Sequence, residues 1–150
     1  MDKSLFDVAC LDEFNNRINK LSQSSQAQWG KMDVAQMLNH CCRPLKIYFG
    51  EAQGKRGIFS LMFGAYFKKN MVNYKPFQRN LPTDKTFKVN DPRKFEEERN
   101  RLMETISRFS KGGPKAIKSS EHPFFGKMNA AEWDILTCKH LDHHLRQFGA

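Results

Sequence analysis

Apolar residues recur every three or four positions along four stretches of the chain, and this spacing lines one face of an α-helix. The first two stretches cover residues 11 to 22 and 34 to about 49. The third starts behind Asp91 and ends at the run Gly112-Gly113-Pro114, and the fourth covers residues 130 to about 148. No convincing strand pattern accompanies them. The periodicity therefore predicts an all-α chain of four helices.

Residue types that begin helices support two of these boundaries. Asp33 is followed three residues later by Gln36, and Asn129 by Glu132. Each pair has the spacing of a capping box, in which the two residues satisfy each other's free backbone N–H groups. Residues 4 to 9 lack such a signal and are predicted to form an irregular lead-in.

The connection between the second and third predicted helices, residues 50 to 90, is long. Within it, Ile58 to Met71 has the length and apolar content of one short helix. The following segment contains Pro76 and Pro82 among many polar residues, so extended irregular chain is expected there. Neighbouring helices are usually joined by short loops. The pattern therefore fits a helical bundle with one long crossover.

Length and cysteine usage narrow the class of protein. A chain of 150 residues fits a single domain, residues 1–150. The four cysteines form no CxxC pair and no secretory signal opens the chain, so reduced thiols in a cytoplasmic protein are expected. The longest apolar stretch, Gly57 to Phe67, is too short to span a bilayer. We therefore expect no membrane partner.

The formal net charge of +9 is high for this length. Such a charge permits acidic partners, namely nucleic acid, anionic lipid or an anionic small molecule. The basic residues are scattered, however, and no run of five occurs. The sequence also lacks a recognition helix or an interleaved aromatic and basic motif of the nucleic-acid-binding classes. Nucleic-acid binding is therefore the least favoured of these interpretations.

The last predicted helix carries an unusually polar stripe. Seven residues project within roughly 60° of one line along it. The large apolar side chains of Trp133 and Leu136 would place this stripe in the core. Burying the polar groups of the same stripe without hydrogen-bond partners would, however, cost free energy. Either the stripe opens into a pocket or a ligand binds the imidazoles. The seven residues are Trp133, Leu136, Thr137, His140, His143, His144 and Gln147.

Two of these histidines have metal-ligand spacing. His140 and His144 are four residues apart, so both imidazoles can reach one ion from the same helix face. His143 is the competing choice, and Gln147 is placed to bond a ligand beside the ion. A solvated polar helix end is the alternative interpretation. No carboxylate shares this face by spacing, so no catalytic residue is assigned.

A third ligand must come from another part of the chain. His40 is the best candidate, because it lies on the second predicted helix beside Pro44, whose missing N–H predicts a kink there. His122 lies in a predicted loop and is the weaker candidate. Three neutral imidazoles would leave a divalent ion its full charge and open positions, as in catalytic sites. Imidazole suits zinc, nickel, copper and iron alike.

Two motifs resemble those of the DinB/YfiT-like superfamily, and in particular a bacterial subfamily of metal-dependent four-helix-bundle proteins that also carries the stretch from His122 to Lys127. The resemblance covers nearly the whole chain. It implies a four-helix bundle of up-down-down-up topology with the long crossover between the second and third helices. The motifs are Trp29-Gly30-Lys31-Met32 followed by Gln36-Met37-Leu38 and His40, and the run from Lys139 to Gly149.

The resemblance also implies a function and a ligand set. By position, His40, His140 and His144 would hold one divalent metal ion, with Zn²⁺ or Ni²⁺ favoured over Fe or Mn. His143 falls on a position that commonly holds histidine but is not the usual ligand. Together with Gln147 it is expected to lie beside the ligands or to contact substrate.

Characterised members of the superfamily include thiol-dependent transferases and isomerases that use bacillithiol or mycothiol, and others are described only as metal-dependent hydrolases. We therefore expect a metal-dependent thiol S-transferase or hydrolase acting on a small molecule, with a low-molecular-weight thiol as one candidate substrate. Dimers are common in the superfamily, so a homodimer is expected. The alternative is a non-catalytic dimeric bundle that its metal stabilises.

Overall fold

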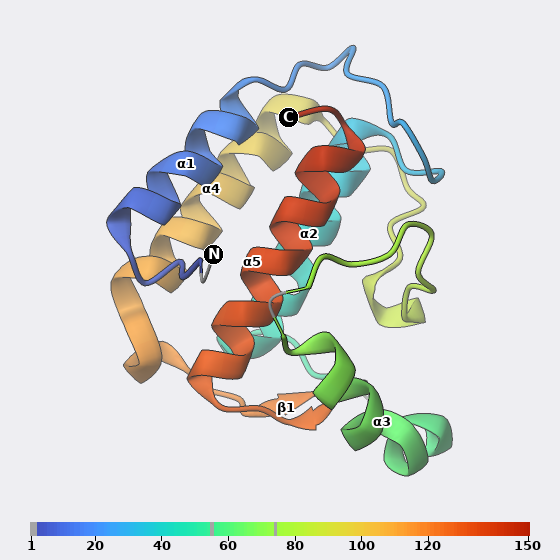
Figure 1. Ribbon diagram of the computed structural model, residues 1–150. Helices are drawn as coiled ribbons and strands as arrows, with labels where there is room; N and C mark the ends of the chain where they lie inside the picture. The colour runs from blue at the N-terminus through green and yellow to red at the C-terminus, as the bar shows by residue number, and fades with distance from the viewer. Residues whose placement is uncertain (1–2, 55, 74) are drawn as a thin grey trace.

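The computed structural model describes residues 3–54, 56–73 and 75–150, and this part of the chain is mostly helical. Of the five α-helices, four run side by side through the body of the molecule and one lies at a corner (Figure 1). The predicted all-α class is confirmed at this level. The helices are α1 (Val8–Asn19), α2 (Val34–Tyr48), α3 (Ile58–Met71), α4 (Phe95–Gly112) and α5 (Ala130–Gln147).

Short elements complete the fold. Two 3-10 turns, η1 (Lys85–Phe87) and η2 (Gly113–Ala116), flank α4. An antiparallel pair joins β1 (Glu121–His122) to β2 (Gly126–Lys127), in a segment that we predicted to be loop up to residue 125. This prediction was wrong in part, because strands of two residues are too short to produce a repeating apolar pattern.

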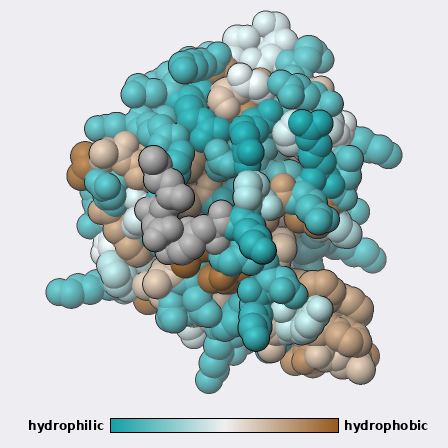
Figure 2. All heavy atoms as spheres, viewed as in Figure 1, coloured by the Kyte–Doolittle hydropathy of each residue, from teal (hydrophilic) through white to brown (hydrophobic). Residues whose placement is uncertain are grey.

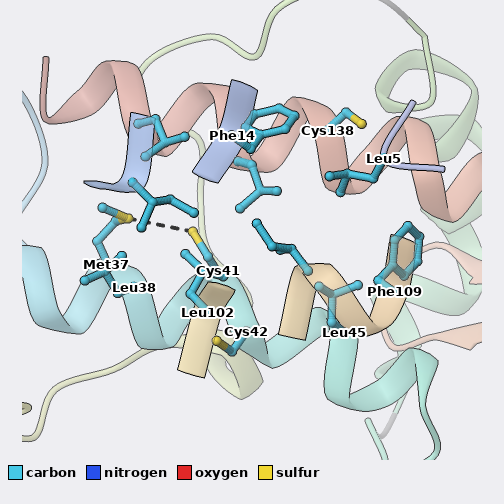
Figure 3. Close-up of a cluster of buried hydrophobic side chains, with 14 of the residues drawn as sticks. Leu5, Phe14, Met37, Leu38, Cys41, Cys42, Leu45, Leu102, Phe109 and Cys138 are labelled. Carbon is cyan, nitrogen blue, oxygen red and sulfur yellow. Dashed lines mark hydrogen bonds between the residues drawn. The ribbon is translucent and has the colours of Figure 1, made fainter. Parts of the chain in front are cut away.

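The core lies where α1, α2, α4 and α5 meet. α2 packs against α4 and α5, and α1 packs against the same two helices. Figure 3 shows side chains from all four converging, together with Leu5 from the lead-in. All four cysteines are buried and free. Among the described helices, none combines the length and apolar character that crossing a bilayer requires.

Both predicted capping boxes are present. The Asp33 side chain accepts from the Gln36 N–H at 2.8 Å, and the Gln36 side chain accepts from the Asp33 N–H at 3.1 Å. Asn129 and Glu132 make the same two bonds, both at 2.9 Å. These caps fix the first residues of α2 and α5, the two helices that carry the predicted metal ligands.

Two predicted helix starts are corrected. α1 begins at Val8, within the predicted lead-in, because Asp7 caps it by accepting from the Ala9 N–H at 3.1 Å. α4 begins at Phe95 and not directly behind Asp91, whose carboxylate pairs with Arg93 at 2.6 Å. For α1 the capping aspartate explains the earlier start, which apolar spacing does not report; α4 starts behind Lys94 without a side-chain cap.

Candidate metal centre

Three imidazoles from two helices converge beside the core. His40 comes from α2, and His140 and His144 come from α5, which lies beside α2 in Figure 1. The Nε2 atoms of His40 and His140 are 2.9 Å apart. One ligand atom from each of the three residues lies within 4.8 Å of the others, so the cluster could hold a metal ion. The predicted convergence of residues about one hundred positions apart is confirmed.

Hydrogen bonds orient two of the rings. The Nδ1 atom of His40 lies 2.8 Å from the Phe87 carbonyl oxygen, and the Nδ1 atom of His144 lies 2.8 Å from the Gln147 side-chain oxygen. Both partners are acceptors, so Nδ1 donates in each case and Nε2 keeps its lone pair. Metal-ligating histidines usually donate their second ring N–H in this way. The donor set therefore fits a divalent ion.

The three imidazoles are held in the neutral form that ligates metals. Burial lowers the pKa of His144 to about 3, and the nearby His40 adds to this. Burial is also the main cause of the lowered pKa of His40, which the bond to the Phe87 carbonyl partly opposes. The pKa of His140 is lowered well below its ordinary value by burial and by the surrounding imidazoles. Protons therefore compete weakly with a metal here.

The glycine of the Trp-Gly-Lys-Met motif makes room for one of these bonds. Gly30 has a φ of +85°, and a Cβ built on it would lie 2.4 Å from the Gln147 side-chain nitrogen. That nitrogen donates to the Trp29 carbonyl at 2.5 Å, while the oxygen of the same amide accepts from His144. The motif and the end of α5 thus form one chain of contacts that leads to a candidate ligand.

An arginine on α2 holds in place the turn that orients His40. The Arg43 guanidinium donates to the carbonyls of Thr86 and Lys88, at 3.2 and 2.7 Å. Phe87 lies between these two residues and presents its own carbonyl to His40. α2 thereby anchors the η1 turn in the long crossover. Residue spacing does not indicate this contact, because the crossover has no regular periodicity.

His143 does not join the three-residue cluster. Its ring lies 5.1 Å from that of His144, between centroids, and also contacts Trp29 and Phe77 at 5.7 and 5.9 Å. It therefore lies beside the candidate ligands, as does Gln147. Gln147 is committed to His144 and the Trp29 carbonyl rather than to an incoming ligand.

His122 lies away from the cluster, in β1. Its Nδ1 atom accepts from the N–H groups of Phe124 and Phe125, at 3.1 and 3.2 Å. Its ring packs against those of Phe125 and Trp133, with centroids 4.6 and 5.3 Å apart. His122 is therefore a structural residue of the β1–β2 turn and not the third ligand.

Two hollows, each of about 360 Å³, meet beside His143. One reaches His144 and Gln147 and is also lined by Lys31 and Lys88. The other is lined by Phe77, Arg79 and Arg146. Trp29 lines both, and the Arg79 guanidinium stacks on its ring at 4.3 Å. Among the described residues, neither hollow is lined by an Asp or Glu side chain, so their walls are cationic.

The sequence did not indicate Trp29 as a residue of the candidate site, yet it lines both hollows. Trp133 is fully buried, whereas Trp29 is half-buried at the mouth of the hollows. Arg79 and Phe77 were missed as well, because they lie in the crossover and only the fold brings them to Trp29 and His143. The sequence signal that could have found Trp29 is its position next to Gly30, outside any helical stripe.

Comparison with known proteins gives one match. A family model described as "Protein of unknown function (DUF1569)" matches residues 1–150. No curated protein and no solved structure matches the chain.

Proposed function

The chain belongs to the family described as a protein of unknown function, DUF1569, and we propose that it is a divalent-metal-dependent enzyme acting on a small molecule, of the thiol S-transferase or hydrolase type. The observation that carries the proposal is the convergence of His40, His140 and His144 at the edge of a hollow. Zn²⁺ or Ni²⁺ is the proposed ion, since three neutral imidazoles suit either.

The residues around the cluster have separable roles in this proposal. Phe87 and Gln147 hold the rings of His40 and His144 in the tautomer that ligates. Trp29 offers an apolar face, and Lys31 and Lys88 offer positive charge, to a small molecule in the hollow. When bound, a divalent ion on three neutral imidazoles supplies Lewis acidity, because its ligands cancel none of its charge.

The resemblance to the DinB/YfiT-like superfamily supports the proposal and adds expectations. These are the up-down-down-up order of the four long helices, a homodimer, a low-molecular-weight thiol as substrate and a cytoplasmic location. The free, buried cysteines agree with a reducing compartment. The alternative, a non-catalytic bundle stabilised by its metal, fits less well, because structural metal sites are normally closed whereas a hollow reaches His144 here.

Metal content tests the proposal directly. We expect about one divalent ion per chain in protein as purified, and loss of most of it in His144→Ala. His143→Gln is the matched control, because His143 lies next to the cluster without joining it. Unchanged metal content in His144→Ala would refute the three-histidine site. A thiol-transfer and ester-hydrolysis screen of the metal-loaded protein, with His144→Ala as the blank, then tests the reaction type.

A further inference from the structure

The large apolar residues of α3 point away from the protein. Figure 2 shows them as a brown cluster at the corner where Figure 1 places α3. Most surface helices instead turn their apolar stripe toward the core. The exposed fractions are 78% for Ile58, 56% for Phe59, 62% for Leu61, 70% for Met62, 42% for Phe63 and 67% for Tyr66.

The inner face of α3 combines small buried residues with one aromatic contact, in which the ring centroids of half-buried Phe67 and of Phe124 are 5.8 Å apart. Ser60 and Gly64 are its buried residues. The Ser60 hydroxyl lies 2.8 and 2.7 Å from the carbonyl oxygens of Pro123 and Phe124. A Cβ on Gly64 would lie 2.3 Å from the same Phe124 oxygen, so the helix sits directly on the β1–β2 turn. Specific contacts therefore fix α3 with its large apolar side chains outward.

A lysine near the end of α3 reinforces this orientation. Lys68 pairs with Glu132 at 3.0 Å, at the start of α5, and donates to the Lys127 carbonyl at 2.9 Å. Turning the apolar face of α3 inward would break these contacts and those of Ser60. The outward face is thus a property of the folded chain.

The shape of the apolar face favours lipid over a protein partner. Viewed along the helix axis, at 100° per residue, the exposed apolar side chains spread over roughly 200°. The directions of Leu61 and Phe63 mark the two edges of this face. A neighbouring helix or flat protein surface covers a stripe of about 100° or a little more. α3 also stands at a corner of the molecule, where a broad surface can reach it without meeting the rest of the chain first (Figure 1).

The charged residues of the segment that contains α3 are all basic, although one of them, Lys68, is paired with Glu132 of α5. Residues 52–83 contain no Asp or Glu, and the whole chain carries +9. Basic residues next to an apolar helix face add electrostatic attraction to anionic lipid headgroups. Two such chains, in contrast, would repel each other if they met through α3. The basic residues of this segment are Lys55, Arg56, Lys68, Lys69, Lys75 and Arg79.

We propose that α3 is an interfacial anchor, which lays its outer apolar face into the surface of a membrane containing anionic lipid. With 14 residues, the helix is about 21 Å long, shorter than the roughly 30 Å hydrocarbon core, so it lies in the interface and does not cross it. This inference departs from our expectation of no membrane partner, which rested on that length alone. It does not depend on the proposed metal chemistry.

Vesicle binding by the full chain tests the anchor. We expect the protein to sediment with phosphatidylcholine vesicles that contain phosphatidylglycerol, and weakly with phosphatidylcholine alone. Met62→Glu should weaken binding to the anionic vesicles by at least about tenfold, because a charge replaces an apolar side chain that enters the lipid. Val8→Glu is the matched control, since Val8 is similarly exposed (67%) but lies on α1.

A labelled variant reports insertion itself. The native cysteines are buried, so Met62→Cys can be labelled selectively with an environment-sensitive dye. We expect a blue shift of its emission with anionic vesicles and little shift for a dye at Val8→Cys. Equal binding of Met62→Glu and wild type would overturn the anchor in favour of plain charge attraction. Absence of binding to the anionic vesicles would overturn both. Light scattering that finds a dimer split by Met62→Glu would assign the face to a second copy.

Discussion

The orientation of His144 depends on one amide. Gln147 accepts from its Nδ1 at 2.8 Å and is itself tied to the Trp29 carbonyl. Replacing Gln147 by Leu keeps a similar volume but removes the acceptor, so the ring loses its fixed tautomer. Changes of this kind typically weaken metal binding by about 10- to 100-fold. We predict such a loss of zinc affinity for Gln147→Leu, measured by competition with a chromogenic chelator.

The control for this prediction is another amide. Gln26 is exposed and bonds only to the nearby Ser24 carbonyl, at 3.3 Å, among the described residues. Gln26→Leu should leave zinc affinity unchanged. If Gln147→Leu also binds zinc like the wild type, the amide does not orient His144 in the metal-loaded protein.

Gly30 leaves room for the Gln147 amide, which links the Trp29 carbonyl to His144, because it has no side chain. Its φ of +85° is unfavourable for other residues, and a Cβ would meet the Gln147 amide at 2.4 Å. Left-handed backbone costs a non-glycine residue about 1–2 kcal/mol. We predict that Gly30→Ala lowers the free energy of unfolding by at least this amount in urea titrations, and that it also weakens zinc binding.

Gly113 offers a control that separates these two effects. It also has a positive φ, +56°, but an added Cβ would meet no atom within 4 Å. Gly113→Ala should therefore show the backbone cost and leave zinc affinity intact. Equal zinc affinity in both alanine variants would contradict the role given to Gly30.

At the scale of elements, signals confined to one helix were predictable, whereas the contacts made by the irregular crossover were not. The Asp33 and Asn129 capping boxes and the spacing of His140 and His144 each lie within a few residues, so the sequence alone indicates them. The Phe87 carbonyl that orients His40 belongs to an irregular crossover, where side-chain spacing carries no periodic signal. Only the complete fold, through the Arg43 contacts, places it.

The orientation of α3 was likewise not predictable, although the helix itself was. Its apolar content predicted a short helix at Ile58 to Met71, and this helix is present. Which face is buried depends on Ser60 and Gly64 meeting the β1–β2 turn some sixty residues away. Hydropathy would instead place the large side chains inside. The sequence pattern therefore locates the helix but not the direction in which it faces.

The β1–β2 turn should make stability depend on pH. Burial lowers the pKa of His122 to about 3, from an ordinary value of 6.5. The unfolded chain then takes up a proton first as the pH falls, so stability is full above about pH 6.5 and declines below it. Between pH 7 and 5 this amounts to about 2 kcal/mol. We predict that the free energy of unfolding falls by this much more in the wild type than in His122→Asn over the same pH range. Urea unfolding at the two pH values measures the difference.

Comparing the two proteins is necessary because other buried histidines also have lowered pKa values and contribute to the decline. Asn can still accept from the N–H groups of Phe124 and Phe125, so the turn keeps its acceptor. The variant is expected to be less stable at pH 7, since it fills less of the space among Phe87, Phe125 and Trp133. Parallel pH curves for the two proteins would show that His122 does not titrate in this window.

Across the whole molecule, the crossover links the metal centre to the proposed anchor. Lys139, next to His140, donates to the Met71 carbonyl at the end of α3, at 2.5 Å, and to the side chain of Asn73. A few residues later, Phe77 and Arg79 form a wall of one hollow. The chain that follows α3 thus supplies part of the wall of the hollow beside His143.

The hydrophobic core and the candidate metal centre are largely separate, and this separation predicts how the molecule responds to metal removal. Fully buried apolar residues such as Phe14, Leu102 and Phe109 lie among the long helices and do not need the histidines to be ligated. We therefore expect chelator-treated protein to keep its helical circular dichroism and cooperative unfolding. Zinc should then raise the unfolding free energy, by about 2.7 kcal/mol at a free concentration one hundred times Kd, because it binds the folded state alone.

His144→Ala should fold without showing this rise, since it lacks one of the three candidate ligands. Loss of the helical signal on chelation would instead mean that the ion supplies folding energy outright, as structural metal sites do. That outcome would favour the non-catalytic, metal-stabilised bundle over the enzyme. The opposite outcome is a stable metal-free fold whose unfolding free energy zinc raises in the wild type alone. The fold would then not require the ion, and the ion could act on an incoming small molecule.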